Sequence, residues 1–153
     1  MDRLELRIPP VALVIGVAVL MWLAGECAPE LSVRFPFQRV VAWVLAFSGM
    51  IICILGVAAF KRAATTVNPT KPESSSSLVT AGIYRRTRNP MYLGFLLMLA
   101  GWAVARANIV AFLGLPAFVL YISHFQIKPE ERALMSIFGD GFKTYCSGVR
   151  RWI

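Results

Sequence analysis

Long apolar runs alternate with short polar segments along this chain of 153 residues. An apolar run of about 20 residues is long enough to cross a membrane as an α-helix, and slightly shorter runs can continue beyond the bilayer into polar flanks. The pattern predicts an all-α integral membrane protein with about four transmembrane helices. These are expected at about residues 10–25, 39–60, 90–105 and 108–124.

Two polar segments separate or follow these runs. Residues 61–89 contain Asn-Pro and Lys-Pro pairs and four consecutive serines, which is typical of an irregular loop. Residues 127–153 begin with charged and apolar residues mixed at helical spacing, which predicts an amphipathic interfacial helix that breaks at Gly139-Asp140-Gly141. The length is typical of one domain, so we treat residues 1–153 as a single membrane domain.

The first two runs each carry a further signal. The first could be a cleaved signal peptide, because basic residues precede it and small residues follow, but the later spans favour a first membrane helix. The second contains Gly49 and Gly56, which would allow close contact with another helix although their spacing is not GxxxG.

Composition and charge support the membrane interpretation. Hydrophobic residues make up 58% of the chain and its net charge is +8, but the basic residues border apolar runs, which argues against a nucleic-acid partner. With four spans, 13 of the 16 Lys and Arg lie on the side of both termini and of residues 61–89. The positive-inside rule predicts that this side is cytoplasmic, as in a bacterial inner-membrane protein. The three cysteines lack ligand spacing, so no metal site is expected.

Two polar features fall on the predicted cytoplasmic side. Pro90 should begin the third helix with Asn89 as its N-cap, and backbone N–H groups there suit an anion. Glu130 and Glu131 are adjacent and would point about 100° apart on a helix. An inward Glu130 could bind a ligand ammonium or sulfonium group, or instead pair with Arg85, Arg86 or Arg88. A helix cap with basic residues at a membrane surface is the simpler alternative for the first feature.

Four motifs carry a resemblance to a known family. They are Leu78–Tyr84 (LVTAGIY), Arg88–Gly94 (RNPMYLG), Pro129–Leu134 (PEERAL) and Phe138–Tyr145 (FGDGFKTY). Over about residues 65–153 the chain resembles integral-membrane methyltransferases, which include isoprenylcysteine carboxyl methyltransferases and phospholipid N-methyltransferases.

The resemblance implies S-adenosylmethionine (SAM) as methyl donor and a lipophilic or amphiphilic acceptor at the cytoplasmic membrane face. A phosphatidylethanolamine-type phospholipid is the alternative acceptor. The implied cofactor contacts are Ser76, Ser77, Leu78, Val79, Tyr84, Asn89, Pro90, Met91, Tyr92 and Glu130. An amine acceptor would have to lose a proton, and His124, Glu131 and Tyr92 are the candidate catalytic groups.

Two positions depart from the prenylcysteine enzymes. Asn89 stands where those enzymes usually have histidine, and Gln126 stands where they place an arginine for the acceptor's carboxylate. Gln126 and the nearby Lys128 are therefore the candidate acceptor-binding residues. Other classes remain open: sterol reductases that use NADPH share a similar C-terminal motif, and a non-catalytic membrane scaffold would use the basic loop to bind anionic lipid.

Overall fold

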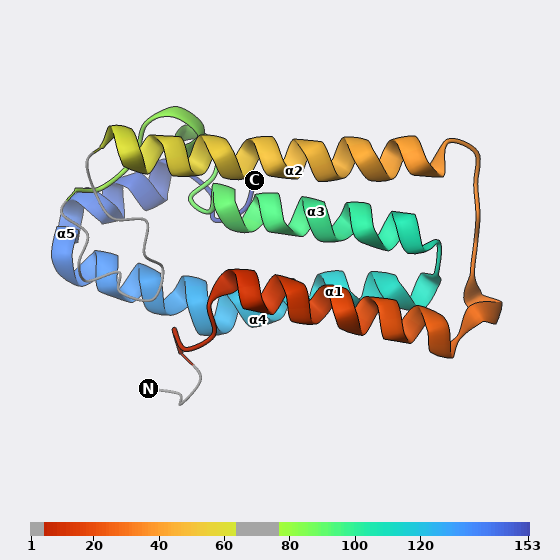
Figure 1. Ribbon diagram of the computed structural model, residues 1–153. Coiled ribbons are helices and arrows are strands. Elements are labelled where there is room, and N and C mark those ends of the chain that lie inside the picture. Colours follow the sequence, from red (N-terminus) through yellow and green to blue (C-terminus); the bar gives the residue numbers. More distant parts are fainter. Residues whose placement is uncertain (1–4, 64–76) are drawn as a thin grey trace.

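The computed structural model describes residues 5–63 and 77–153, which form a bundle of helices (Figure 1). The long helices are α1 (Pro10–Cys27), α2 (Gln38–Arg62), α3 (Pro90–Arg106), α4 (Gly114–Ile122) and α5 (Lys128–Gly148). Short turns accompany them: η1 (Pro29–Leu31), η3 (Gly82–Arg85), η4 (Ile109–Leu113) and the π-helical η5 (Ser123–Ile127). The described ranges contain no strand beyond a single bridge between Ser32 and Asn108. The predicted all-α fold is confirmed.

Three stretches are long and apolar enough to cross a membrane: α1, α2 and the continuous helix from Ile109 to Gly148. α3 is also apolar but has 17 residues. Large apolar side chains cover the outer faces of α1 and α2, among them Leu20 and Trp43, which are 65% and 63% exposed. Such a surface suits lipid tails and is unfavourable in water. The chain is an integral membrane protein with three to four spanning helices.

α2 and α3 lie side by side because small residues recur at every seventh position (Figure 1). The buried residues of α2 are Ala42, Gly49 and Gly56. A Cβ atom on Gly94 of α3 would come within 2.6 Å of the Gly49 carbonyl oxygen, and one on Gly101 within 2.6 Å of that of Ala42. Backbones approach this closely where small residues leave room. The expected close contact at Gly49 and Gly56 is confirmed, and the small residues that make it are seven positions apart.

The fourth predicted span differs in form from the expectation. It begins as the 3-10 turn η4, and η5 then joins α4 to α5, although we expected a span at 108–124 and a separate interfacial helix within 127–153. Pro129 has no N–H to offer the Phe125 carbonyl four residues earlier. That carbonyl accepts a 3.1 Å bond from the Leu6 N–H, and the Lys128 N–H bonds to Ser123 across the π-helical turn. The chain therefore passes the proline as one helix.

α5 changes direction at Gly139, as the glycine pair predicted. Its φ of 50° and ψ of −122° are not helical, and the positive φ favours glycine. The chain then folds back, and Figure 1 shows the C-terminus beside the start of α3. The same end of the bundle holds η3, the start of α5 and the end of α2, whereas the α1–α2 and α3–η4 connections lie at the other end. The predicted polar features therefore gather at one end.

Candidate functional site

A buried cluster forms where α3 and α5 begin. Tyr92, the third residue of α3, donates a 2.6 Å hydrogen bond from its hydroxyl to Oε1 of Glu130, the third residue of α5. Gln126 donates from Nε2 to the same oxygen over 2.9 Å. Tyr92 and Gln126 are 5% and 3% exposed. Two neutral donors thus orient one partly buried carboxylate.

The π-helical turn sets the position of Gln126 relative to Glu130. Its wider i→i+5 bonding shifts the register between α4 and α5, and such turns are frequent at functional sites. Gln126 and Ile127 are buried within the turn, and Ile127 belongs to the hydrophobic core. The turn therefore aims one polar side chain inward among apolar neighbours.

Glu131 faces a different set of partners, as expected for adjacent helical residues. Arg151 donates to it from Nε over 3.0 Å and from the guanidinium NH2 over 2.6 Å, and Arg88 approaches Oε1 at 3.4 Å. The hydrogen bond and charge of Glu131 raise the pKa of the Arg151 guanidinium against a smaller opposing effect of burial. The sequence left open a salt bridge between Glu130 and a loop arginine. In the structure Glu131 forms such a salt bridge, while the recorded bonds of Glu130 go to Tyr92 and Gln126.

The C-terminal segment is bound against the approach to α3. The backbone N–H of Arg88 donates to the Arg150 carbonyl over 3.0 Å. The Arg151 carbonyl accepts bonds from the Asn89 side chain at 2.9 Å and from the Thr87 hydroxyl at 3.3 Å. The side chain of Arg88 also reaches the Cys146 sulfur. These bonds fix the position at which α3 begins.

Asn89 occupies the predicted N-cap position, but its side chain does not cap the helix. Its amide is bound to Arg151, so the first N–H groups of α3 have no side-chain cap. Pro90 is fully buried at the first helical position, where it removes one N–H that needs no helical partner. The remaining N–H groups and the positive end of the helix suit an anionic group.

Tyr84 lies on the side of the cluster nearer to α2. It is 5% exposed and its ring contacts Phe60 edge to face at 5.4 Å. Its carbonyl accepts a 2.7 Å bond from the Tyr145 hydroxyl, and burial raises the pKa of Tyr84 far above its usual value. The Tyr84 phenol therefore stays neutral.

The structure places the other predicted residues as follows. Val79 is buried, whereas Leu78 and Met91 are partly buried. Ser77 donates to the Ala63 carbonyl over 3.1 Å. His124 and Lys128 are exposed. Ser76 lies outside the described residues.

Several residues of this cluster were not predicted from the sequence. Thr87, Cys146 and the C-terminal residues Arg150 and Arg151 contact partners 58 to 64 positions away. Trp152 packs against the hydrophobic core. The apolar tryptophan beside two terminal arginines was the available signal, because such a residue at a polar chain end has to bury its ring.

Comparison with known proteins identifies the family. A family model described as phospholipid methyltransferase matches residues 37–141, which include Tyr92, Gln126 and Glu130. The chain belongs to the phospholipid methyltransferase family, a class of membrane methyltransferases.

Individual relatives agree with this class. A probable protein-S-isoprenylcysteine O-methyltransferase of Oryza sativa subsp. indica is 32% identical over 79% of this chain and 63% of its own length. Methanethiol S-methyltransferase 1 of Bradyrhizobium diazoefficiens is 26% identical over 76% of this chain and 40% of its own length. An uncharacterized Haemophilus influenzae protein is 46% identical over 41% of this chain and all of its own length. The matched region of this chain thus covers less than two thirds of the length of either named enzyme.

Proposed function

We propose that this protein is a SAM-dependent methyltransferase that acts on a lipophilic or amphiphilic acceptor at the membrane face. The observation that carries the proposal is the Glu130 carboxylate, oriented by Tyr92 and Gln126 beside the start of α3. Methyl transfer from SAM needs a site that grips a charged donor and keeps water out.

The chemistry of the cluster fits SAM. Both recorded bonds to Glu130 end on Oε1, and both come from neutral donors, so no ion pair recorded within the described residues competes with a ligand cation for this carboxylate. The uncapped start of α3 suits the carboxylate of an amino-acid moiety. Tyr84 and Val79 offer buried apolar surface for a flat aromatic group. Together, Leu78, Val79, Tyr84, Asn89, Pro90, Met91, Tyr92 and Glu130 would hold the cofactor, which supplies an electrophilic methyl group when bound.

The acceptor side of the proposal rests on Gln126. A permanently charged arginine would grip an acceptor carboxylate bidentately, whereas Gln126 is neutral and donates to Glu130. Lys128 is exposed. We therefore expect an amphiphilic acceptor, with a phosphatidylethanolamine-type lipid as the alternative, and slow turnover of a prenylcysteine carboxylate. Tyr92, Glu131 and His124 are the candidate proton acceptors for an amine. Two arginines hold Glu131, and the Tyr92 hydroxyl already donates to Glu130, so each would have to give up a recorded partner.

Calorimetry on the purified full chain in detergent tests the cofactor. SAM and S-adenosylhomocysteine should bind and NADPH should not. Binding of NADPH without SAM would favour a sterol-reductase-like enzyme, and binding of none of the three would favour a scaffold. Transfer of a radiolabelled methyl group to phosphatidylethanolamine and to a prenylcysteine analogue then compares the two acceptor classes.

The candidate site would face the cytoplasm of a bacterial cell, at the inner membrane. Both chain ends and residues 61–89 would then be cytoplasmic, in accord with the 13 basic residues on that side. Cys27 is exposed at the opposite end of the bundle and is therefore replaced first. A membrane-impermeant thiol reagent should then leave a Cys27→Ser/Ser75→Cys variant unmodified in intact cells. Labelling from outside would reverse the assigned orientation.

A further inference from the structure

A groove of about 920 Å³ lies at the end of the bundle away from the candidate functional site. It is bounded by the last turns of α1 and α3 and the first turns of α2. Ala42, Ala46 and Gly101 are among its lining residues, and α2 and α3 meet there through small residues. The groove is therefore apolar where it follows the membrane interior.

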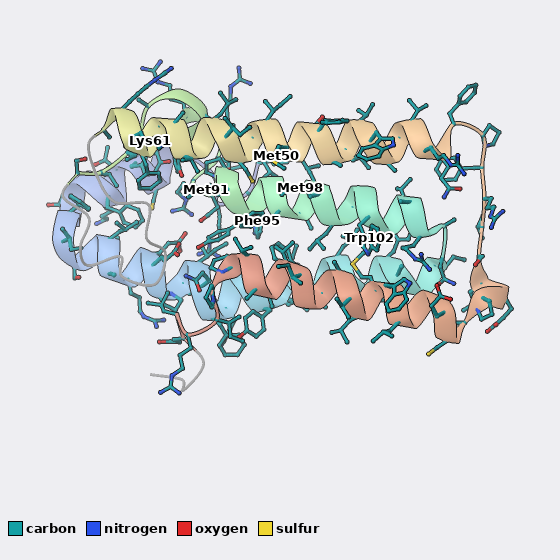
Figure 2. The ribbon with its side chains drawn as sticks, viewed as in Figure 1. Met50, Lys61, Met91, Phe95, Met98 and Trp102 are labelled. Atoms are coloured by element: carbon teal, nitrogen blue, oxygen red, sulfur yellow. The ribbon has the colours of Figure 1, made fainter. Side chains whose placement is uncertain are left out.

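Aromatic and sulfur-containing side chains extend this apolar surface along α3. Met98 and Trp102 line the groove, and the Trp102 indole N–H donates to the Ala18 carbonyl of α1 over 3.0 Å. Figure 2 shows Met91 and Met98 on the side of α3 that faces α2, and Phe95 and Trp102 on the side that faces α1. Met98 and Trp102 thus give the groove an apolar wall against which a hydrocarbon chain could pack.

The connection from α1 to α2 forms a fixed rim around the groove. Val33 donates from its backbone N–H to the Ala107 carbonyl over 2.6 Å, and Asn108 donates from its side chain to the Ala28 carbonyl over 2.7 Å. Gln38 donates from Nε2 to the Val104 carbonyl over 2.8 Å. These bonds between segments distant in sequence shape the groove before a ligand arrives.

The rim is positively charged. Arg34, Arg39 and Arg106 line the groove together with one acid, Glu26, which is paired with Arg106. Within the described ranges no ion pair is recorded for Arg34 or Arg39. Arg39 also lies in the first turn of α2, where the positive helix end disfavours a cation, so an external anion would relieve both charges.

Arg106 supplies an independent sign of a missing partner. It lies over the Trp102 ring at 5.9 Å, and its Nε atom is buried without a hydrogen-bond partner among the residues described. A buried donor without a partner is costly, and a bound water or ion beside it is one physical explanation.

We propose that this groove binds an anionic phospholipid from the leaflet opposite the candidate functional site. The phosphate would lie between Arg34 and Arg39, whose planar guanidinium groups match phosphate oxygens, and an acyl chain would lie on Met98 and Trp102. This lipid site does not depend on the proposed function, because it lies at the other end of the bundle and uses none of the residues assigned to the cofactor.

Lipid binding to the delipidated full chain in detergent micelles tests the proposal. Native mass spectrometry and thermal unfolding would compare phosphatidylglycerol, phosphatidylcholine and glycerol 3-phosphate. One phosphatidylglycerol should bind with stabilisation, and the other two should not. The variant Arg34→Gln/Arg39→Gln should bind it at least about tenfold more weakly, a loss of about 1.4 kcal/mol.

The matched control is Lys61→Gln/Arg62→Gln. It removes two charges from the last turn of the same helix, α2, at the end where Figure 2 labels Lys61. The control should keep full phosphatidylglycerol binding. Equal losses in the two variants, or equal binding of phosphatidylcholine, would overturn the site and indicate general charge or detergent effects. Equal stabilisation by glycerol 3-phosphate would overturn the lipid assignment in favour of a soluble phosphate ligand.

Discussion

The hydroxyl of Tyr92 donates a 2.6 Å hydrogen bond to Glu130 across 38 positions of the chain. Each residue is the third of its helix, so the bond joins the starts of α3 and α5. Gln126 reaches the same Glu130 oxygen from the π-helical turn between α4 and α5. The direction of the carboxylate is thus determined by two helices and one irregular turn.

Tyr92→Phe tests the importance of that direction. The ring is kept and one hydrogen bond to a charged group is lost, so SAM affinity should fall about tenfold or more. Tyr121→Phe is the matched control, because the Tyr121 hydroxyl is buried without a recorded partner. Calorimetry should show unchanged SAM affinity for this control. If the two variants bind SAM with equal affinity, the Tyr92 hydroxyl does not contribute to cofactor binding.

Gly94→Ala tests the close packing of α2 and α3. The new methyl group would meet the Gly49 carbonyl oxygen at 2.6 Å, which should destabilise the protein by about 1–3 kcal/mol. Gly16→Ala, in the middle of α1, meets nothing within 4 Å and should be neutral or stabilising by up to about 1 kcal/mol. Unfolding by sodium dodecyl sulfate in mixed micelles measures both. A neutral Gly94→Ala would mean that the two helices are farther apart.

Arg151→Ala tests the role of the C-terminal segment. Arg151 is bound to Glu131 by its side chain, and its carbonyl holds Asn89 at the start of α3. The side chain is 37% exposed, so the loss of stability should be modest, about 1 kcal/mol or less. SAM affinity should nevertheless fall several-fold, because the start of α3 is less well positioned.

Arg132→Ala is the control for that experiment. It removes a comparable ion pair, with Glu5, whose arginine side chain is 57% exposed. Its SAM affinity should match the unmodified protein. If Arg151→Ala and Arg132→Ala have the same affinity, the C-terminal segment stabilises the fold without positioning the site.

The spanning helices were largely predictable, because the length of an apolar run is a local property of the sequence. The expected ranges 39–60 and 90–105 correspond to Gln38–Arg62 and Pro90–Arg106. The divergence of Glu130 and Glu131 also followed from helix geometry, since one faces Tyr92 and the other faces arginines. Periodicity and spacing were enough for these features.

The passage through Pro129 and the C-terminal contacts were not predictable in the same way. The helix continues past the proline because a distant backbone group, the Leu6 N–H, bonds to the Phe125 carbonyl. Arg151 reaches Asn89 across 62 positions and thereby takes over the side chain expected to cap α3. Both are tertiary hydrogen bonds that override a local preference. A single sequence does not show which distant residues come into contact.

Calorimetry of SAM binding to Glu130→Gln is the most direct test of the proposed site. The substitution keeps the shape of the side chain and removes its charge, while the unfolding midpoint should stay close to that of the unmodified protein. Loss of a charged partner in a desolvated site costs about 2–3 kcal/mol, so SAM affinity should fall about 30- to 150-fold. An unchanged SAM affinity in a folded Glu130→Gln protein would contradict the proposal that this carboxylate binds the cofactor.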